Sequence, residues 1–227
     1  MNNILMRKPK LEEMCPVGYH VVRGHQRLCN SGTLTWVDAH NARNIKRTLK
    51  VHLVENIHFL YWNAKLDGYA NLKTIKGFPA HHEIDIAIQF WIDYWKEQGL
   101  KFPHDFDPLI VKALIAIESR FDPRASARTS TATGLMQVTN TTRRDLSGQK
   151  RNGYRLIKDQ IVSVNLVDLK DPLINIAVGT RWLAAKVTQI PRGNTLNTFS
   201  LLKAYNQWNS EGDAYAKKVL DLYEQSK

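Results

Sequence analysis

Glu118 ends the most apolar stretch of the sequence. The run from Leu109 to Ile117 is almost wholly hydrophobic, and Phe121-Asp122-Pro123 breaks the chain soon after Glu118. This pattern predicts a buried helix that emerges at a carboxylate. Burial raises the pKa of a carboxyl group because the charged form loses hydration, which suits a general acid working near neutral pH. A glutamate at a helix end is also commonly just solvated, so position alone does not assign catalysis.

Residues 114–138 contain two motifs separated by a polar loop. They read Leu-Ile-Ala-Ile-Glu-Ser-Arg-Phe-Asp-Pro-Arg-Ala-Ser and, after the loop, Ala-Thr-Gly-Leu-Met-Gln-Val. This resembles the signature of the lytic transglycosylases, which are relatives of goose-type lysozyme. Two later segments resemble the third and fourth motifs of that family: Asp171-Pro172 with Asn175-Ile176, Gly179 and Trp182-Leu183, and then Ala204-Tyr205-Asn206. Four motifs in family order make the resemblance specific over about residues 105–227.

The resemblance implies a mainly α, lysozyme-like (goose-type) catalytic domain that cleaves peptidoglycan glycan strands. Family members split the MurNAc–GlcNAc β-1,4 bond with one glutamate that acts first as acid and then as base. The C6 hydroxyl of the substrate attacks the anomeric carbon and closes a 1,6-anhydro ring, so no water is consumed. Glu118 is the residue that matches this glutamate. The resemblance implies no cofactor.

By the same resemblance, five further residues serve substrate binding: Ser119, Met136, Gln137, Tyr205 and Asn206. Gln137 and Asn206 would hydrogen-bond the sugars, and Met136 would line the cleft. Tyr205 would hold Glu118 in place, and Ser119 would steady the neighbouring backbone. Met136 and its neighbour Leu135 are also readily explained as core packing, because apolar residues in such loops usually fill a core.

Two other functions stay open at this stage. Most glycosidases use two carboxylates, so a lysozyme-type hydrolase would need a second acid, for which Asp122, Asp145 and Asp213 are candidates. Asp122 precedes a proline, which is more typical of a turn or cap. The other alternative is a non-catalytic protein that binds the cell wall or nucleic acid.

The sequence departs from the family pattern in three places. The loop Thr129-Ser130-Thr131 is unusually polar, and Gln207-Trp208 follows the fourth motif where a small residue and glycine are common. The spacing between Gln137 and Ile176 exceeds the family minimum. We expect an inserted hairpin or lid there, within Gly148–Val167, including the strand-like run Gln160–Val164.

Helical periodicity dominates the chain that must position these residues. Apolar residues at Ile57, Leu60 and Tyr61 indicate one helix, and a regular stripe from Ile84 to Trp95 predicts an amphipathic helix ending near Gly99. Two later helices begin with an N-cap carboxylate followed by proline, at Asp107-Pro108 and Asp171-Pro172. The spacing from Leu173 to Val187 and from Ala216 to Tyr223 is helical as well.

Composition and charge divide the chain into three predicted parts: a basic module (1–50), a helical connecting region packed on the catalytic domain (51–104) and the catalytic domain (105–227). The hydrophobic fraction of 43% argues against a disordered chain. Nine basic and three acidic residues fall within residues 1–50. No apolar stretch approaches the roughly 20 residues of a membrane span. We expect a β-hairpin in the first part, pairing Tyr19–Arg23 with Thr33–Val37.

The first 50 residues also hold a cluster of metal-ligating side-chain types: Cys15, His20, His25 and Cys29, with His40 further on. A zinc ion, a Cys15–Cys29 disulfide and plain surface histidines all fit this spacing, which is not that of a standard zinc finger.

The net charge of +11 favours a polyanionic partner. The motifs favour the cell wall over nucleic acid. Residues 1–16 do not resemble a secretory signal. We therefore expect action on the wall, in the periplasm or outside, after injection, lysis or export by a secretion system. A phage component or a secreted effector with an immunity protein would fit this route.

Overall fold

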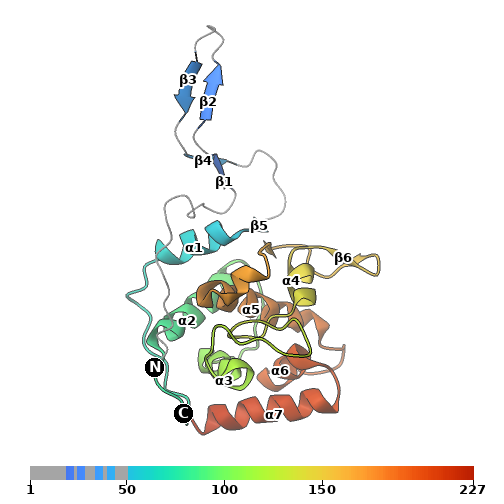
Figure 1. Ribbon diagram of the computed structural model, residues 1–227. Helices are drawn as coiled ribbons and strands as arrows, with labels where there is room; N and C mark the ends of the chain where they lie inside the picture. The colour runs from blue at the N-terminus through green and yellow to red at the C-terminus, as the bar shows by residue number, and fades with distance from the viewer. Residues whose placement is uncertain (1–18, 23–24, 29–33, 38–39, 44–50) are drawn as a thin grey trace.

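The computed structural model describes residues 51–227 and, before them, the backbone of residues 19–22, 25–28, 34–37 and 40–43. The body is a bundle of helices, as predicted from the sequence (Figure 1). Its helices are α1 (Val54–Trp62), α2 (His82–Glu97), α3 (Pro108–Ser119), α4 (Asn140–Leu146), α5 (Pro172–Lys186), α6 (Thr198–Asn206) and α7 (Ser210–Glu224). Two short 3-10 turns are η2 (Val167–Lys170) and η3 (Val187–Gln189).

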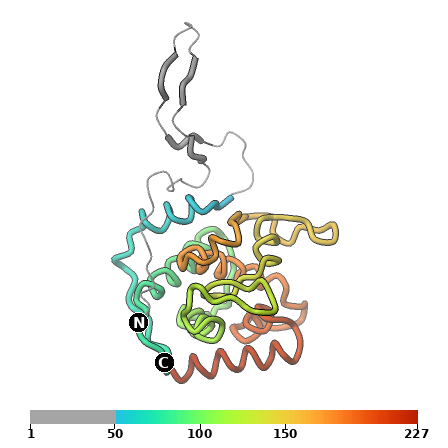
Figure 2. Tube along the Cα trace, viewed as in Figure 1, coloured from blue at the N-terminus to red at the C-terminus, as the bar shows by residue number. Residues whose placement is uncertain are grey.

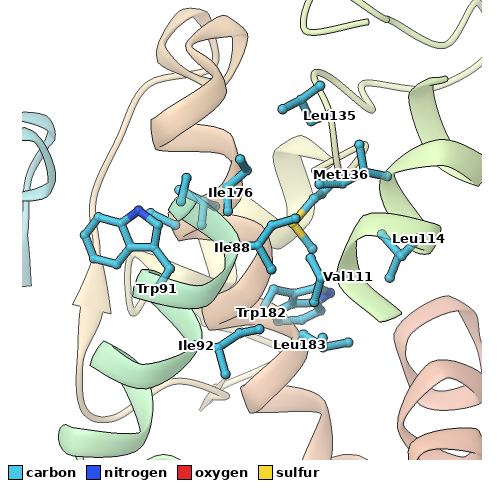
Figure 3. Close-up of a cluster of buried hydrophobic side chains, with 14 of the residues drawn as sticks. Ile88, Trp91, Ile92, Val111, Leu114, Leu135, Met136, Ile176, Trp182 and Leu183 are labelled. Atoms are coloured by element: carbon cyan, nitrogen blue, oxygen red, sulfur yellow. The ribbon is translucent and has the colours of Figure 1, made fainter. Parts of the chain in front are cut away.

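Helix α5 is the centre of the bundle. Every residue from Pro172 to Ala185 is buried, which agrees with its weakly one-sided apolar pattern. Helix α2 packs against α5 and α3, while α7 packs against α6 and α3. The core side chains of α2, α3 and α5 meet around Met136, as Figure 3 shows. Helix α3 is therefore covered from both sides by other helices.

The two predicted aspartate caps are confirmed. Asp107 Oδ1 accepts a hydrogen bond from the Leu109 amide at 2.8 Å, and Asp171 Oδ1 accepts one from the Leu173 amide at 2.9 Å. Such a cap stabilises a helix by about 1 kcal/mol because it satisfies an otherwise unpaired backbone donor. Helices α3 and α5, which carry residues of the first and third motifs, thus begin at a defined position.

A buried ion pair joins α3 to α2. Lys112 Nζ lies 2.7 Å from Asp85 Oδ1, and neither side chain is exposed to solvent. The same ammonium donates a hydrogen bond to the carbonyl of Lys73 at 3.0 Å. Burial raises the pKa of Asp85, whereas the bond to Lys112 opposes that rise. The single charge inside apolar α3 is therefore neutralised by an element next to it.

The N-terminal strands pair differently from the sequence prediction. Strand β1 (Tyr19–Val22) is antiparallel to β4 (His40–Arg43), and β2 (His25–Leu28) is antiparallel to β3 (Leu34–Val37). The predicted second strand is present as β3, but its partner is the polar run His25–Leu28. The predicted partner, Tyr19–Arg23, pairs with His40–Arg43 instead, so that part of the prediction is wrong. Cys15 and Cys29, and the side chains of His20 and His25, lie outside the described residues. The zinc and disulfide hypotheses therefore stay predictions.

The segment between α4 and α5 contains the predicted hairpin. Strands β6 (Lys150–Arg151) and β7 (Tyr154–Arg155) are antiparallel, whereas β8 (Ile161–Val162) pairs in parallel with β5 (Val51–His52). The strand-like run that begins at Gln160 therefore belongs to a separate sheet. Figure 2 shows how this sheet brings the blue start of the body next to the orange segment before α5. Among the described residues, no helix is long and apolar enough to cross a membrane.

Candidate active site

Glu118 lies in the last turn of α3, where the helix leaves the core. All residues from Leu109 to Ala116 are buried, while Glu118 is half-buried. Ser119 is buried, and its hydroxyl donates to the Ile115 carbonyl at 3.1 Å. The Ser119 side chain is therefore bonded within the helix end.

The chain turns sharply after Ser119. Arg120 and Phe121 have φ angles of 54° and 63°, a region that costs a non-glycine residue roughly 1 kcal/mol or more. Aromatic contacts hold this turn: the Phe121 ring stacks on His81 with centroids 4.2 Å apart and meets Phe78 edge-on. The strain ends α3 one residue beyond Glu118 and so fixes where the carboxyl group emerges.

The direct partner of Glu118 is Tyr215 of α7. The Tyr215 hydroxyl donates a hydrogen bond to Glu118 Oε1 at 2.6 Å. Burial raises the pKa of Glu118, while the Tyr215 hydrogen bond and the charge of Lys218 pull it down. The charged side chain that acts on this carboxyl is therefore a cation, not a second carboxylate. Lys218 also lines a groove of about 540 Å³ between Ile117 and α7.

The glycine-containing loop of the second motif is held by Asn175 of α5. Asn175 is fully buried, accepts a hydrogen bond from the Met136 amide at 2.8 Å and donates to the carbonyls of Thr133 and Leu169. Gly134 has a φ of 78°, and a Cβ there would lie 2.2 Å from Asn175 Nδ2. Glycine at 134 is therefore required both by the backbone conformation and by this close approach.

Gln137 is placed in the same loop with a φ of 45°. Its amide nitrogen donates to the carbonyls of Gly134 at 2.8 Å and Ala125 at 3.2 Å. Because both amide donors are used by the loop, Oε1 is the polar atom of Gln137 that can accept a hydrogen bond from a ligand.

The prediction that Met136 lines the cleft is wrong for its side chain. Met136 has no exposed surface and lies between Ile88 and Val111 in the core (Figure 3). A Cβ on Gly179 would lie 2.3 Å from Met136 Sδ, so the side chain fills the space that this glycine leaves. The apolar environment favours the packing explanation that the sequence had left open.

The prediction that Tyr205 holds Glu118 directly is also corrected. The Tyr205 hydroxyl donates to the Met136 carbonyl at 2.8 Å, and the bond to Glu118 comes from Tyr215. Tyr205 is nevertheless close to the carboxyl group: burial and then the charge of Glu118 raise its pKa. Tyr205 ties the second motif to α6, and Asn206 is exposed at the end of that helix.

The three other candidate carboxylates have partners of their own. Asp122 Oδ1 accepts a hydrogen bond from the Arg124 amide at 2.8 Å, which is the predicted turn. Asp213 pairs with Lys203 at 2.7 Å, and Asp145 lies 3.6 Å from Arg151. None of these contacts points to a role as partner of Glu118.

Sequence reasoning missed Tyr215 because it lies 97 residues from Glu118 and outside the four motifs. Its one sequence signal is its position directly before the predicted helical stretch from Ala216 to Tyr223. The position of Asn175 was recognised as part of a motif, but its support of the loop emerges only from the packing of α5.

Residues 93–221 match a known protein family, the Transglycosylase SLT domain. The chain belongs to this family. The match covers more than half of the chain and begins within α2. The protein is therefore an enzyme, a lytic transglycosylase that acts on peptidoglycan, and its site of action is the cell wall. No curated protein and no solved structure gives a significant match.

Proposed function

We propose that this SLT enzyme cleaves the MurNAc–GlcNAc β-1,4 bond with Glu118 as its single acid and base, giving 1,6-anhydro products. The observation that carries the proposal is the surroundings of Glu118. A half-buried carboxyl group with a raised pKa has a tyrosine hydroxyl, not a carboxylate, as its partner. Such a group keeps its proton to a higher pH than a solvated glutamate does.

In this mechanism, Glu118 donates its proton to the glycosidic oxygen as the C1–O bond breaks. The C6 hydroxyl of MurNAc then bonds to C1, and its proton passes to the Glu118 carboxylate, which restores the acid. Because Tyr215 occupies Oε1, the proton travels on Oε2. Tyr215 stabilises the carboxylate form between the two transfers, since a hydrogen bond to an ionised group favours that group.

The remaining predicted residues divide into two kinds. Gln137 Oε1 and the exposed Asn206 are proposed to hydrogen-bond the sugars. Ser119, Met136 and Tyr205 act by shaping the site, because their side chains are bonded or packed within the protein. Residues 51–104 are proposed to form the framework behind α3, with α2 holding Lys112.

The test is digestion of purified sacculi with the wild type, Glu118→Gln and the control Glu97→Gln. Glu97 is exposed at the end of α2. We expect release of muropeptides to fall by roughly 10² to 10⁴ in Glu118→Gln, because general acid–base catalysis typically contributes a factor of this size. The control is expected to match the wild type.

Mass spectrometry of the products tests the type of reaction separately from the role of Glu118. Anhydro ends, lighter by one water than reducing ends, are expected. Reducing ends that are lost in Glu118→Gln would show a lysozyme-type hydrolase and overturn the anhydro mechanism. Equal release by Glu118→Gln would overturn the role of Glu118.

A further inference from the structure

The positive charge of the described body is concentrated in one short segment. Residues 143–158 hold six of the 23 basic residues between 51 and 227, and only one of the 18 acidic residues there. The rest of that region therefore carries seventeen of each. The net charge of the enzymatic body is that of this segment, which is the insertion between the second and third motifs.

The tip of the segment is a tight two-residue hairpin. Asn152 and Gly153 connect β6 to β7 with φ angles of 51° and 81°, which is the type I′ turn favoured by Asn-Gly. Across the strands, Lys150 pairs with Arg155, and Arg151 pairs with Tyr154. Like charges placed opposite one another repel, so this pair does not serve the stability of the hairpin.

The hairpin side chains face solvent. Residues 149–156 are all exposed, and Tyr154 keeps 81% of its surface accessible. An aromatic side chain this exposed between cationic residues is typical of a binding surface, because it offers an apolar face and a hydroxyl together. We name the four residues Lys150, Arg151, Tyr154 and Arg155 the basic hairpin.

The base of the basic hairpin is fixed to the enzymatic core. Arg143 donates to the Val164 carbonyl at 2.8 Å, and Arg144 donates to the Gln149 side chain at 2.8 Å. Arg151 lies 3.6 Å from buried Asp145, and its charge contributes to lowering the pKa of Lys186 at the end of α5, after burial. The basic hairpin therefore projects from the C-terminal end of α4, next to α5, the helix that supports the Gly134–Gln137 loop.

We propose that the basic hairpin binds the carboxylates of the peptide stems of peptidoglycan while the glycan strand lies at Glu118. This inference rests on the proposed function. A glycan strand that reaches the Gln137 loop carries a stem with free carboxylates on its MurNAc units. Charge complementarity favours this ligand, because the rest of residues 51–227 carries no net charge. The basic hairpin also follows the Gly134–Gln137 loop in the chain, with α4 between them.

The experiment measures retention on sacculi free of secondary anionic polymers, in the Glu118→Gln background so that the substrate is not consumed. The test variant is Lys150→Glu/Arg155→Glu, which reverses one cross-strand pair. The matched control is Lys65→Glu/Lys101→Glu, which makes the same charge change at two exposed positions elsewhere. Each protein is also measured on glycan strands whose stems have been removed by an amidase, and on a short DNA duplex.

We expect the hairpin variant to bind intact sacculi about tenfold more weakly, because each exposed ion pair contributes a modest free energy. The control and the unfolding midpoints are expected to stay unchanged, and the hairpin variant should match its parent on stem-free strands. Unchanged retention, equal loss in the control, or equal loss on stem-free strands would each overturn the proposal. A loss confined to DNA would instead assign the hairpin to nucleic acid.

Product release by the protein that keeps Glu118 separates the binding proposal from the proposed catalytic function. If the wild-type enzyme releases no anhydro products from intact sacculi while the retention difference persists, the catalytic proposal fails and the binding proposal stands. If anhydro products form but the hairpin variant is retained as its parent is, only the binding proposal fails.

Discussion

Two charged residues of α3, Lys112 and Glu118, lie in different surroundings. Lys112 is fully buried, and its charge is neutralised by Asp85 at 2.7 Å. Glu118 lies less than two turns further on and is half-buried, and within the described part of the chain the group bonded to it is the Tyr215 hydroxyl. Helix α3 therefore carries a buried ammonium group that is paired with a carboxylate, and a half-buried carboxyl group whose Oε2 is available to a substrate.

The contrast shows which buried charge does chemistry. An ion pair with both members buried tends to be structural, since separating it leaves an uncompensated charge. A carboxyl group that burial pushes toward its neutral form, without a counter-charge in contact, is poised to give and take a proton. The first site should respond to mutation in stability, and the second in rate and pH dependence.

The largest effect on stability is expected from the buried ion pair between Lys112 and Asp85. Lys112→Met leaves Asp85 inside the core without its cation, and breaking a buried pair in this way costs about 3–5 kcal/mol. The free energy of unfolding, measured by urea denaturation, should fall by that amount. The double variant Lys112→Met/Asp85→Leu should recover most of the loss, because no charge is then stranded. If Lys112→Met were as stable as the wild type, the ion pair would not be structural, and the proposed difference between Lys112 and Glu118 would be contradicted.

The Gly134–Gln137 loop gives the next effect. Asn175→Ala removes the side chain that satisfies the Met136 amide, the Thr133 carbonyl of the loop and the Leu169 carbonyl of η2. Unsatisfied buried polar groups cost about 1–3 kcal/mol, so unfolding should become easier by roughly 2 kcal/mol. Activity should fall with it, since Gln137 loses its fixed position. Asn194→Ala, on an exposed loop, is the control and should change neither.

Tyr215→Phe tests the effect of the hydrogen bond on the half-buried carboxyl group of Glu118. The lost hydrogen bond lowers the pKa of Glu118 in the wild type, so its removal should raise that pKa further. The fall in activity at rising pH should therefore begin at a higher pH in the variant than in the wild type, while the maximal rate falls about fivefold. Tyr223→Phe, which loses a bond to the Asp107 cap, is the matched control. It should lower stability and leave the pH profile unchanged.

The smallest effect is expected from Lys218→Gln. Its charge lowers the pKa of Glu118 without direct contact, so the pH profile should move in the same direction as in Tyr215→Phe, but less. Lys217→Gln removes the neighbouring charge of α7 and serves as control. High salt should reduce the Lys218 effect and not the Tyr215 effect, and the reverse ranking would contradict this assignment.

Local signals in the sequence were sufficient for much of the helical body. The apolar stripe from Ile84 to Trp95 and the two Asp-Pro starts predicted α2, α3 and α5, because helix periodicity and capping act within a few residues. The hairpin insertion was expected from its length, and Asn152-Gly153 is the turn signal that places it. Short α4 was not predicted, since seven residues carry little periodicity.

Contacts between distant segments could not be predicted in the same way. Tyr215 and Tyr205 both lie on C-terminal helices, and only the packing of α6 against α7 decides which hydroxyl reaches Glu118. Before residue 44, the strands Tyr19–Val22 and Leu34–Val37 were expected, but the strand between them was missed because His25–Leu28 has no apolar alternation. Met136 was ambiguous for a related reason: a methionine suits both a cleft and a core.

The most direct measurement is the titration of the Glu118 side-chain carboxyl by carbon-13 NMR, with its signal assigned by its absence in Glu118→Gln. The account predicts a midpoint above that of an ordinary glutamate, moving higher still in Tyr215→Phe. A midpoint at or below the ordinary value, or one that Tyr215→Phe lowers, would contradict the claim that burial holds the catalytic proton.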